Sequence, residues 1–230
     1  SLMYSPNSNK ELKSLDRKID INNIFTQNRL SLSDSVEGGE SLTLGGEYNL
    51  KSKENGNDVV VAGLATIIRN SEERNLPNKS TINNQVSDIV GSLIFEPNSN
   101  LKFDYNFSMD NDLQSTNYNL LKSDISVNKF VTSFEFLQED DEIGNESYLS
   151  NETSYNFNST NSLKYRTRRN KKTDFTEFYN LIYEYKNDCL TASIQYNKDY
   201  YSDNDLKPTE ELFFSISIIP LATLNTPSAK

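Results

Sequence analysis

The sequence has no histidine and no tryptophan, and it contains one cysteine in 230 residues. Without histidine, neither a Ser-His-Asp nor a Cys-His arrangement for nucleophilic catalysis can be built. The acidic runs EDDE at 139–142 and DNDL at 110–113 and 203–206 are candidates for cation binding. Neither DNDL run has the glycine and distal glutamate of a calcium loop, so we expect solvated loops. The sequence predicts no enzyme, no cofactor and no metal site.

Long apolar segments and excess positive charge are also missing. The longest apolar run, VVVAGLATII at 59–68, has roughly half the residues that a membrane-spanning helix needs. Lysine and arginine number 23 against 33 aspartate and glutamate residues, a net charge of -10. Proteins that bind duplex nucleic acid usually have the opposite balance, because phosphate neutralisation supplies most of their affinity. The composition argues against a helical membrane protein and against nucleic-acid binding.

The strongest positive signal is the alternation of apolar and polar residues, which is the period of a strand with two different faces. In LKFDYNFSM at 101–109, every odd-numbered residue is apolar and every even-numbered residue is polar. Similar runs occur at 41–50, 175–185, 190–196 and 212–218, with Glu177 as an exception. Segments rich in Asn, Asp, Ser and Pro separate the runs, as turns do. The pattern predicts an all-β fold of about 11 antiparallel strands in up-and-down order.

Two architectures can contain such strands. A soluble sandwich buries the apolar faces between two sheets and typically has strands of about 5–6 residues. A transmembrane barrel turns the apolar face to lipid and the polar face to a lumen, with strands of about 9–11 residues. The predicted strands are long, and their second face is polar at nearly every position. This favours the barrel over the sandwich.

The cysteine lies immediately before one of the alternating runs. Counting by two from Leu190 places Cys189, Thr191, Ser193 and Gln195 on the polar face. An odd cysteine suggests a disulfide partner outside the visible chain, and disulfides persist in the periplasm and at the cell surface. An inert leftover thiol is the alternative.

The basic cluster RTRRNKK at 166–172 either contacts phosphate groups or is a polar strand face that runs into a charged loop.

Several segments resemble the LPS-assembly outer-membrane protein family LptD. The family pattern Asn-Leu-Phe, Asn-Arg-Phe and Asp-Arg-x-Glu-x-Gly is similar to INNIFTQNRLSLSDSVEGG, and SDIVGSLIFEPNSNLKFDYNFSMDND is similar to the family's following hairpin. LIYEYKNDCLTASIQYNKDYYSDNDLKPTEELFFSISI resembles its last two strands, including the Asp-Cys step. The matching motif positions are Asn23, Ile24, Phe25, Asn28, Arg29, Leu30, Asp34, Glu37 and Gly38.

The resemblance implies the C-terminal part of a transmembrane barrel of about 26 strands. Residues 1–38 would be mostly an extracellular loop segment, residues 39–219 the barrel strands and residues 220–230 a C-terminal tail. Lipopolysaccharide would enter the outer leaflet through the lumen and a lateral gate, beside lumen-facing Thr191, Ser193 and Gln195. The closing strand of the gate would be Phe213, Phe214, Ser215, Ile216, Ser217, Ile218 and Ile219.

The resemblance also implies partners and a place in the cell. It implies an integral protein of the Gram-negative outer membrane that contacts lipopolysaccharide, outer-membrane lipids, an LptE-like lipoprotein plug and the barrel-assembly machinery. An LptA-like periplasmic bridge would dock on the N-terminal domain that this chain lacks. Cys189 would form a disulfide with a cysteine of that domain. Leu190 stands where many members have a second adjacent cysteine, so at most one such bridge forms.

Two other functions stay open at the level of sequence. A general outer-membrane porin or channel would have a seamlessly closed barrel and no need of the disulfide. A soluble all-β surface domain would be released from membranes by a carbonate wash. Upstream sequence distinguishes a porin or channel from a member of the LptD family. A periplasmic domain with a cysteine would precede the barrel only in the LptD family.

Overall fold

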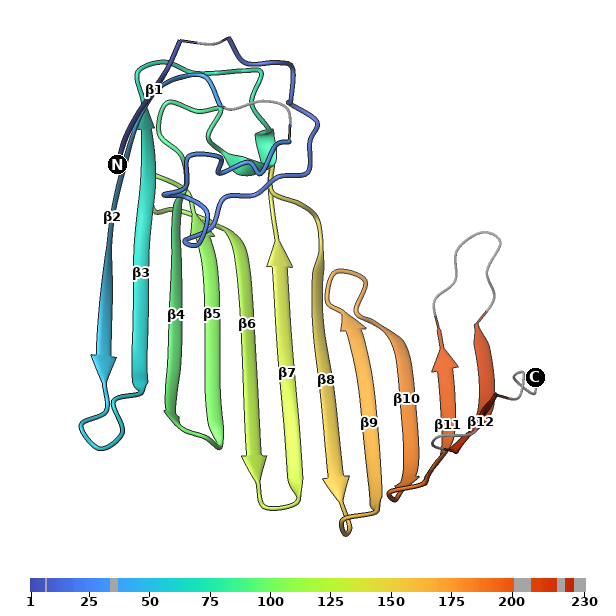
Figure 1. The fold of residues 1–230 in the computed structure, drawn as a ribbon. Coiled ribbons are helices and arrows are strands. Elements are labelled where there is room, and N and C mark those ends of the chain that lie inside the picture. Colours follow the sequence, from blue (N-terminus) through green and yellow to red (C-terminus); the bar gives the residue numbers. More distant parts are fainter. Residues whose placement is uncertain (7, 34–36, 201–207, 219–221, 226–230) are drawn as a thin grey trace. The chain divides into compact units, whose positions relative to one another are not determined.

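The chain forms one long antiparallel sheet with very little helix (Figure 1). The computed structural model describes residues 1–6, 8–33, 37–200, 208–218 and 222–225. In that part of the chain, no helix is long and apolar enough to span a membrane. The elements are β1 (Leu2–Ser5), β2 (Gly39–Lys51), β3 (Asp58–Arg69), the 3-10 helix η1 (Asn78–Ser80), β4 (Ile89–Asn98), β5 (Leu101–Met109), β6 (Thr116–Val127), β7 (Phe130–Glu139), β8 (Ser147–Asn156), β9 (Asn161–Asn170), β10 (Phe175–Lys186), β11 (Leu190–Asp199), β12 (Thr209–Ile218) and β13 (Ala222–Asn225).

The predicted all-β, up-and-down antiparallel fold is confirmed. The strands of the described residues follow each other in sequence order from β1 to β13, so the thirteen-stranded sheet is open, with these two strands at its ends. Short strands also occur in the segments for which the sequence predicts a loop and a tail. β1 lies within residues 1–38 and pairs with β2, and β13 lies within residues 220–230 and pairs with β12.

The sheet is divided between two compact units, and each is described by itself. The first unit comprises residues 1–98, 102–121 and 137–146, and the second comprises residues 99–101, 122–136 and 147–230. The second unit therefore contains β8 to β13 with the adjoining parts of β6 and β7.

Strand pairing gives the second unit one polar and one apolar face. Thr191 pairs with Ser217, and Ser193 pairs with Ser215, so these hydroxyl side chains share one face. On the other face Ile194 pairs with Phe214, and both are exposed. We call the side of Thr191 and Ser193 the polar face and the side of Ile194 the apolar face. The same two faces continue across β8 to β10 because the ladders are in register apart from one bulge in β10, although Asn151 and Thr153 of β8 lie on the apolar side and Ile182 of β10 lies on the polar side.

The connections differ in length at the two ends of the strands. Because neighbouring strands are antiparallel, successive connections alternate between the ends. One end has short turns: 52–57, 99–100, 128–129, 157–160 and 187–189. The other end has the longest connections, 6–38 and 70–88, as well as 110–115, 140–146, 171–174 and 200–208. We call these the turn end and the loop end.

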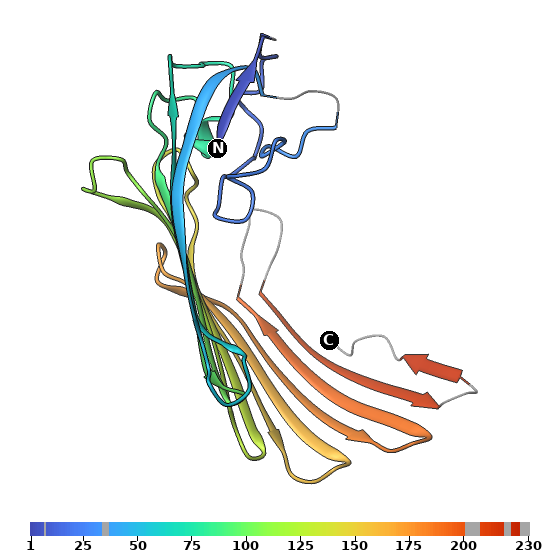
Figure 2. The same cartoon turned by 60° about the vertical axis from the view of Figure 1, so that its left-hand side comes forward.

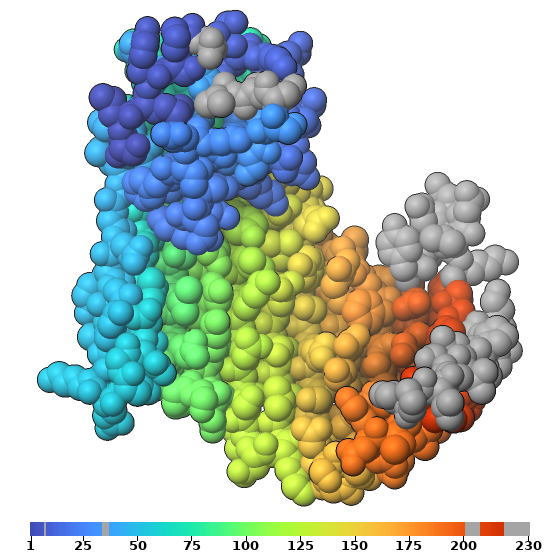
Figure 3. Space-filling model, viewed as in Figure 1, coloured from blue at the N-terminus to red at the C-terminus, as the bar shows by residue number. Residues whose placement is uncertain are grey.

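In the first unit, the two longest connections cover the polar face of β2 to β5 at the loop end. Figures 1 and 2 show the N-terminal segment on one side of β2 and β3, and Figure 3 shows it covering their upper part. Thr43 and Ile67 are directly paired on the covered face, and both are buried. The apolar residues of the resulting core are Ile19, Ile24, Leu30, Ala65, Ile67, Leu76, Ile82 and Val90.

A buried carboxylate ties the first of these two connections, which we call the covering segment, to the sheet. Glu37 Oε2 accepts a hydrogen bond from Arg29 Nε at 2.8 Å, and Glu37 Oε1 accepts one from Arg29 Nη2 at 3.2 Å. The second guanidinium, that of Arg69 at the end of β3, forms an ion pair with the same carboxylate. Arg29 also donates to Ser41 Oγ at 2.6 Å and to Thr43 Oγ1 at 3.1 Å, both on β2. The cluster thus joins the loop to the first two long strands.

Arg29 stays cationic in the folded chain. Burial lowers the pKa of Arg29 to about 10, so its guanidinium is still a cation at neutral pH. Two cations therefore share the buried Glu37 carboxylate. Removing one member of a buried ionic cluster leaves charge without compensation in a poorly solvated site, which is strongly destabilising.

We expect Glu37→Gln in the full-length protein to destabilise the first unit by about 3–5 kcal/mol, because two buried guanidiniums lose their countercharge. The midpoint of urea unfolding in detergent and the rate of proteolysis within residues 6–38 report the loss. Glu40→Gln is the matched control, since Glu40 is exposed and accepts a hydrogen bond from the side chain of the exposed Asn70. Equal effects of the two substitutions would contradict the assigned role of Glu37.

Candidate functional site

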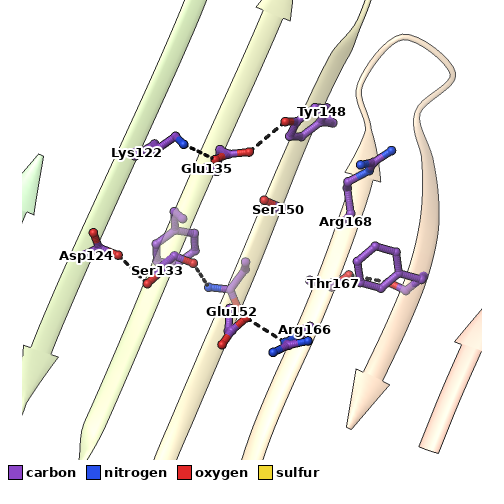
Figure 4. A pocket seen from close by; sticks show the side chains of 13 residues that line it. Lys122, Asp124, Ser133, Glu135, Tyr148, Ser150, Glu152, Arg166, Thr167 and Arg168 are labelled. Carbon is purple, nitrogen blue, oxygen red and sulfur yellow. Dashed lines mark hydrogen bonds and ion pairs between the residues drawn. The ribbon is translucent and has the colours of Figure 1, made fainter. Parts of the chain in front are cut away.

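A charged groove lies on the polar face of the second unit (Figure 4). Its volume is about 380 Å³, and β6 to β10 all contribute side chains. The lining residues are Lys122, Asp124, Ser133, Phe134, Glu135, Tyr148, Ser150, Asn151, Glu152, Arg166, Thr167, Arg168 and Phe178. Because the strands are paired antiparallel neighbours, charges from the four consecutive strands β6 to β9 are brought side by side.

In one row of side chains across the groove, each charged group has a defined ion-pair, hydrogen-bond or cation–π partner. Lys122 Nζ lies 3.0 Å from Glu135 Oε2, and the Tyr148 hydroxyl donates to Glu135 Oε1 at 2.8 Å. The Arg168 guanidinium lies 4.8 Å from the centre of the Tyr148 ring, in a cation–π contact, and also forms an ion pair with Glu177. The carboxylates and cations of this row therefore each have defined partners.

Glu177 reaches Arg168 because of a β-bulge. The register between β9 and β10 shifts between Thr176 and Phe178, which leaves Glu177 as the extra residue. A bulge re-aims side chains and breaks the strict alternation of a strand. This explains why Glu177 departs from the alternating pattern of the sequence, and the pattern alone did not identify it as a partner of Arg168.

A second row contains one carboxylate between two cations. Arg166 Nε lies 2.8 Å from Glu152 Oε2, and Lys164 Nζ lies 3.4 Å from Glu152 Oε1. The Arg166 Nε–H is not aligned for a hydrogen bond. All three side chains are well exposed, at 45% for Glu152, 43% for Arg166 and 38% for Lys164. Exposed pairs of this kind contribute only about 0.2–1 kcal/mol each.

The basic cluster at 166–172 is split by strand alternation. Arg166 and Arg168 lie on the polar face and line the groove. Arg169 instead forms an ion pair with Asp174 at 2.7 Å, next to the connection between β9 and β10. Phosphate contact by this cluster therefore stays a prediction for Arg166 and Arg168.

The predicted lumen residues share the polar face. Thr191, Ser193 and Gln195 pair with Ser217, Ser215 and Phe213 respectively. Phe214, Ile216 and Ile218 lie on the apolar face and are exposed. Ile219, the last residue of the predicted gate strand, lies outside the described residues. β12 is not the outermost described strand, because β13 pairs with its residues Ser215 to Ile218.

Cys189 lies in the turn before β11 rather than within the strand, and its thiol is free and exposed. The turn is closed by the side chain of Asn187, whose Oδ1 accepts from the backbone N–H of Cys189 at 3.0 Å and of Leu190 at 2.8 Å. This connection belongs to the turn end. The structure therefore leaves Cys189 accessible to a partner at that end.

Two charged contacts of the first unit were not anticipated from the sequence. Lys18, in the covering segment, forms an ion pair with Glu139 and lies 5.3 Å from the centre of the Tyr118 ring. Glu139 is buried at the end of β7, so the prediction of a solvated loop for 139–142 was wrong at this residue. Lys18 fixes the segment over β6 and β7, and only the tertiary contact reveals the role of Glu139.

Asp88, just before β4, is a buried acid. Its Oδ2 accepts from Ser108 Oγ and from Asn117 Nδ2, each at 2.9 Å. Burial raises the pKa of Asp88 above its ordinary value, and the charges of Asp110 and Asp141 act in the same direction. The two hydrogen bonds lower the pKa but do not overcome burial. The acid joins the loop-end termini of β4, β5 and β6.

A comparison with protein families agrees with the sequence resemblance at the level of the family. A family model described as LptD, LPS transport system D, matches residues 4–131, which is more than half of the chain. A search among curated proteins gave no match. The matched region includes Arg29, Glu37 and Arg69 of the buried cluster. It ends before β8, so most of the groove, Cys189 and β12 lie outside it.

We expect Asp88→Asn to stabilise the protein more at about pH 7 than at about pH 3. The raised pKa means that the folded state binds the Asp88 proton more tightly than the unfolded state does. Stability from this group is present below the ordinary value of 3.8 and is lost as the pH rises through the raised value. Thermal unfolding of wild type and variant at both pH values tests this, and an equal shift at both would contradict it.

Proposed function

The chain belongs to the LptD family of LPS transport components, and we propose that it is the outer-membrane part through which lipopolysaccharide reaches the cell surface. The observation that carries this proposal is the separation of the two faces in the second unit. A saccharide headgroup needs a polar route, whereas acyl chains and the surrounding bilayer need an apolar one. The alternating strands provide both surfaces in a single layer.

The apolar face supports contact with lipid. Leu181, Ile194, Phe214 and Ile216 are exposed there although they are large and apolar. Contiguous exposed apolar surface marks an interaction site in soluble proteins, and it is the expected outer surface of a membrane barrel. Strands of nine to thirteen residues, such as β5 and β2, are long enough to cross a bilayer when tilted.

The unequal connections support an orientation. Outer-membrane barrels have short periplasmic turns and longer extracellular loops. The turn end would therefore face the periplasm, and the loop end, with the covering segment of the first unit, would face the outside. In this orientation Cys189 faces the periplasm, where disulfides persist. A cysteine of the periplasmic N-terminal domain is the partner that we propose for it.

β12 would form one edge of the lateral gate. In the whole barrel the first strand would take the edge of β12 that β13 occupies here along Ser215 to Ile218, and lipopolysaccharide would leave between the two strands. Ser215 and Ser217, with Thr191, Ser193 and Gln195, would line the polar side of the exit, and Phe214, Ile216 and Ile218 its lipid side. An LptE-like lipoprotein plug, an LptA-like bridge, the barrel-assembly machinery and outer-membrane lipids are the partners that this proposal implies.

The disulfide is tested in isolated outer membranes that contain the full-length protein. We expect gel mobility to change on addition of reductant for wild type and to be insensitive to reductant for Cys189→Ser. Ser193→Cys in the Cys189→Ser background is the control for thiol position. A wild-type protein without a reductant-dependent shift would remove the proposed cross-link and favour a channel whose thiol is idle.

The exit route is tested by a pair of adjacent substitutions. We expect Ser215→Trp to lower the delivery of lipopolysaccharide to the surface, because the indole fills the polar side of the exit. Phe214→Trp is the control, because it places the same side chain on the lipid side, where aromatic residues are tolerated. Surface lipopolysaccharide is measured by labelling of intact cells at equal levels of folded protein. Equal loss in both variants would argue against the assigned faces.

A further inference from the structure

The row around Glu152 has an excess of cations that the rest of the groove lacks. Glu152 is the carboxylate within ion-pair distance of both Lys164 and Arg166. In the other row, Lys122 has Glu135 and Arg168 has Glu177. Asp124 accepts from Ser133 at 2.6 Å. The charges of the groove and their partners are therefore closely balanced, except where Arg166 and Lys164, which is not itself a lining residue, share one carboxylate.

The ion pair between Glu152 and Arg166 is exposed and poorly aligned, so an incoming anion can replace Glu152. Arg166 and Glu152 are each more than two fifths exposed, and the Arg166 Nε–H is not aligned on the carboxylate. The Arg168–Glu177 pair differs, because Glu177 is only 15% exposed and Arg168 also lies over Tyr148. An incoming anion would thus displace Glu152 from Arg166 more easily than it would displace Glu177 from Arg168.

The geometry suits an oxyanion attached to a sugar. A guanidinium offers several N–H groups in a planar fork, which matches phosphate and carboxylate oxygens, and a nearby ammonium adds a second positive charge. Ser150 and Tyr148 line the same groove and are able to exchange hydrogen bonds with hydroxyl groups. The groove therefore combines an anion contact with the polar surroundings that a saccharide requires.

We propose that Lys164 and Arg166 bind a phosphate group of the lipopolysaccharide headgroup during passage, and that Glu152 competes with this phosphate so that the contact stays weak. This inference rests on the proposed function and assigns a step within it. Passage requires binding that is favourable enough to admit the ligand and weak enough to release it. A carboxylate built into the site achieves this, because it takes over the two cations when the headgroup leaves.

The test uses the purified full-length protein in detergent and lipopolysaccharide with intact phosphate groups. We expect Glu152→Gln to bind it about threefold more tightly and to release it more slowly, and Arg166→Gln to bind it about threefold more weakly. Arg166→Lys, which keeps the charge but loses the planar fork, should lie between wild type and Arg166→Gln. Asp58→Asn and Lys51→Gln are matched controls, because they break an exposed pair of the first unit at 3.5 Å.

The comparison of ligands decides the assignment. A gain in Glu152→Gln that disappears with dephosphorylated lipopolysaccharide supports the proposal. The same gain for dephosphorylated lipopolysaccharide, which has no phosphate to displace Glu152, overturns it. Unchanged binding in both Glu152→Gln and Arg166→Gln also overturns it, while the proposed function stands if wild type binds and delivers lipopolysaccharide. If wild type does neither, the proposed function itself is wrong.

Discussion

The constraint on which the structure depends is the pairing of antiparallel strands whose side chains alternate between two faces. Ladder hydrogen bonds hold Ser193 opposite Ser215 and Glu152 opposite Arg166, so polar side chains from different strands gather on one face. A slip of one residue in any ladder would exchange the faces of that strand. The apolar surface, the groove and the two faces of β12 all follow from this register. Where the register shifts, in β10, the bulge brings Glu177 to Arg168.

The two units use the polar face differently. In the first unit, long connections cover it, and the buried Glu37 carboxylate holds two guanidiniums where the covering segment meets β2 and β3. In the second unit the same kind of face carries an open groove with exposed ion pairs. The difference in burial explains the difference in energetic role. Buried charges must be compensated for the fold to form, whereas exposed charges are available to a ligand.

The groove also shows why net charge is a poor guide to local chemistry. The whole chain has a net charge of -10, which argues against phosphate binding. Yet Lys122 of β6 and Lys164, Arg166 and Arg168 of β9 lie on one face of the sheet, where carboxylates nearly balance them. A balanced surface of this kind attracts an anion only at short range. That property suits a transit route better than a storage site, because long-range attraction would slow release.

The sequence by itself determined the strands, because a period of two fixes which residues share a face before any partner strand is known. Thr191, Ser193 and Gln195 were placed in this way, and the family match agrees with the motif around Arg29 and Glu37. Only the tertiary structure decided which charges meet. The partners of Glu37, Glu139 and Glu152 come from other strands or from distant loops, and periodicity carries no information on sequence-distant contacts. The bulge at Glu177 was hidden for the same reason, since only pairing with β9 reveals an extra residue.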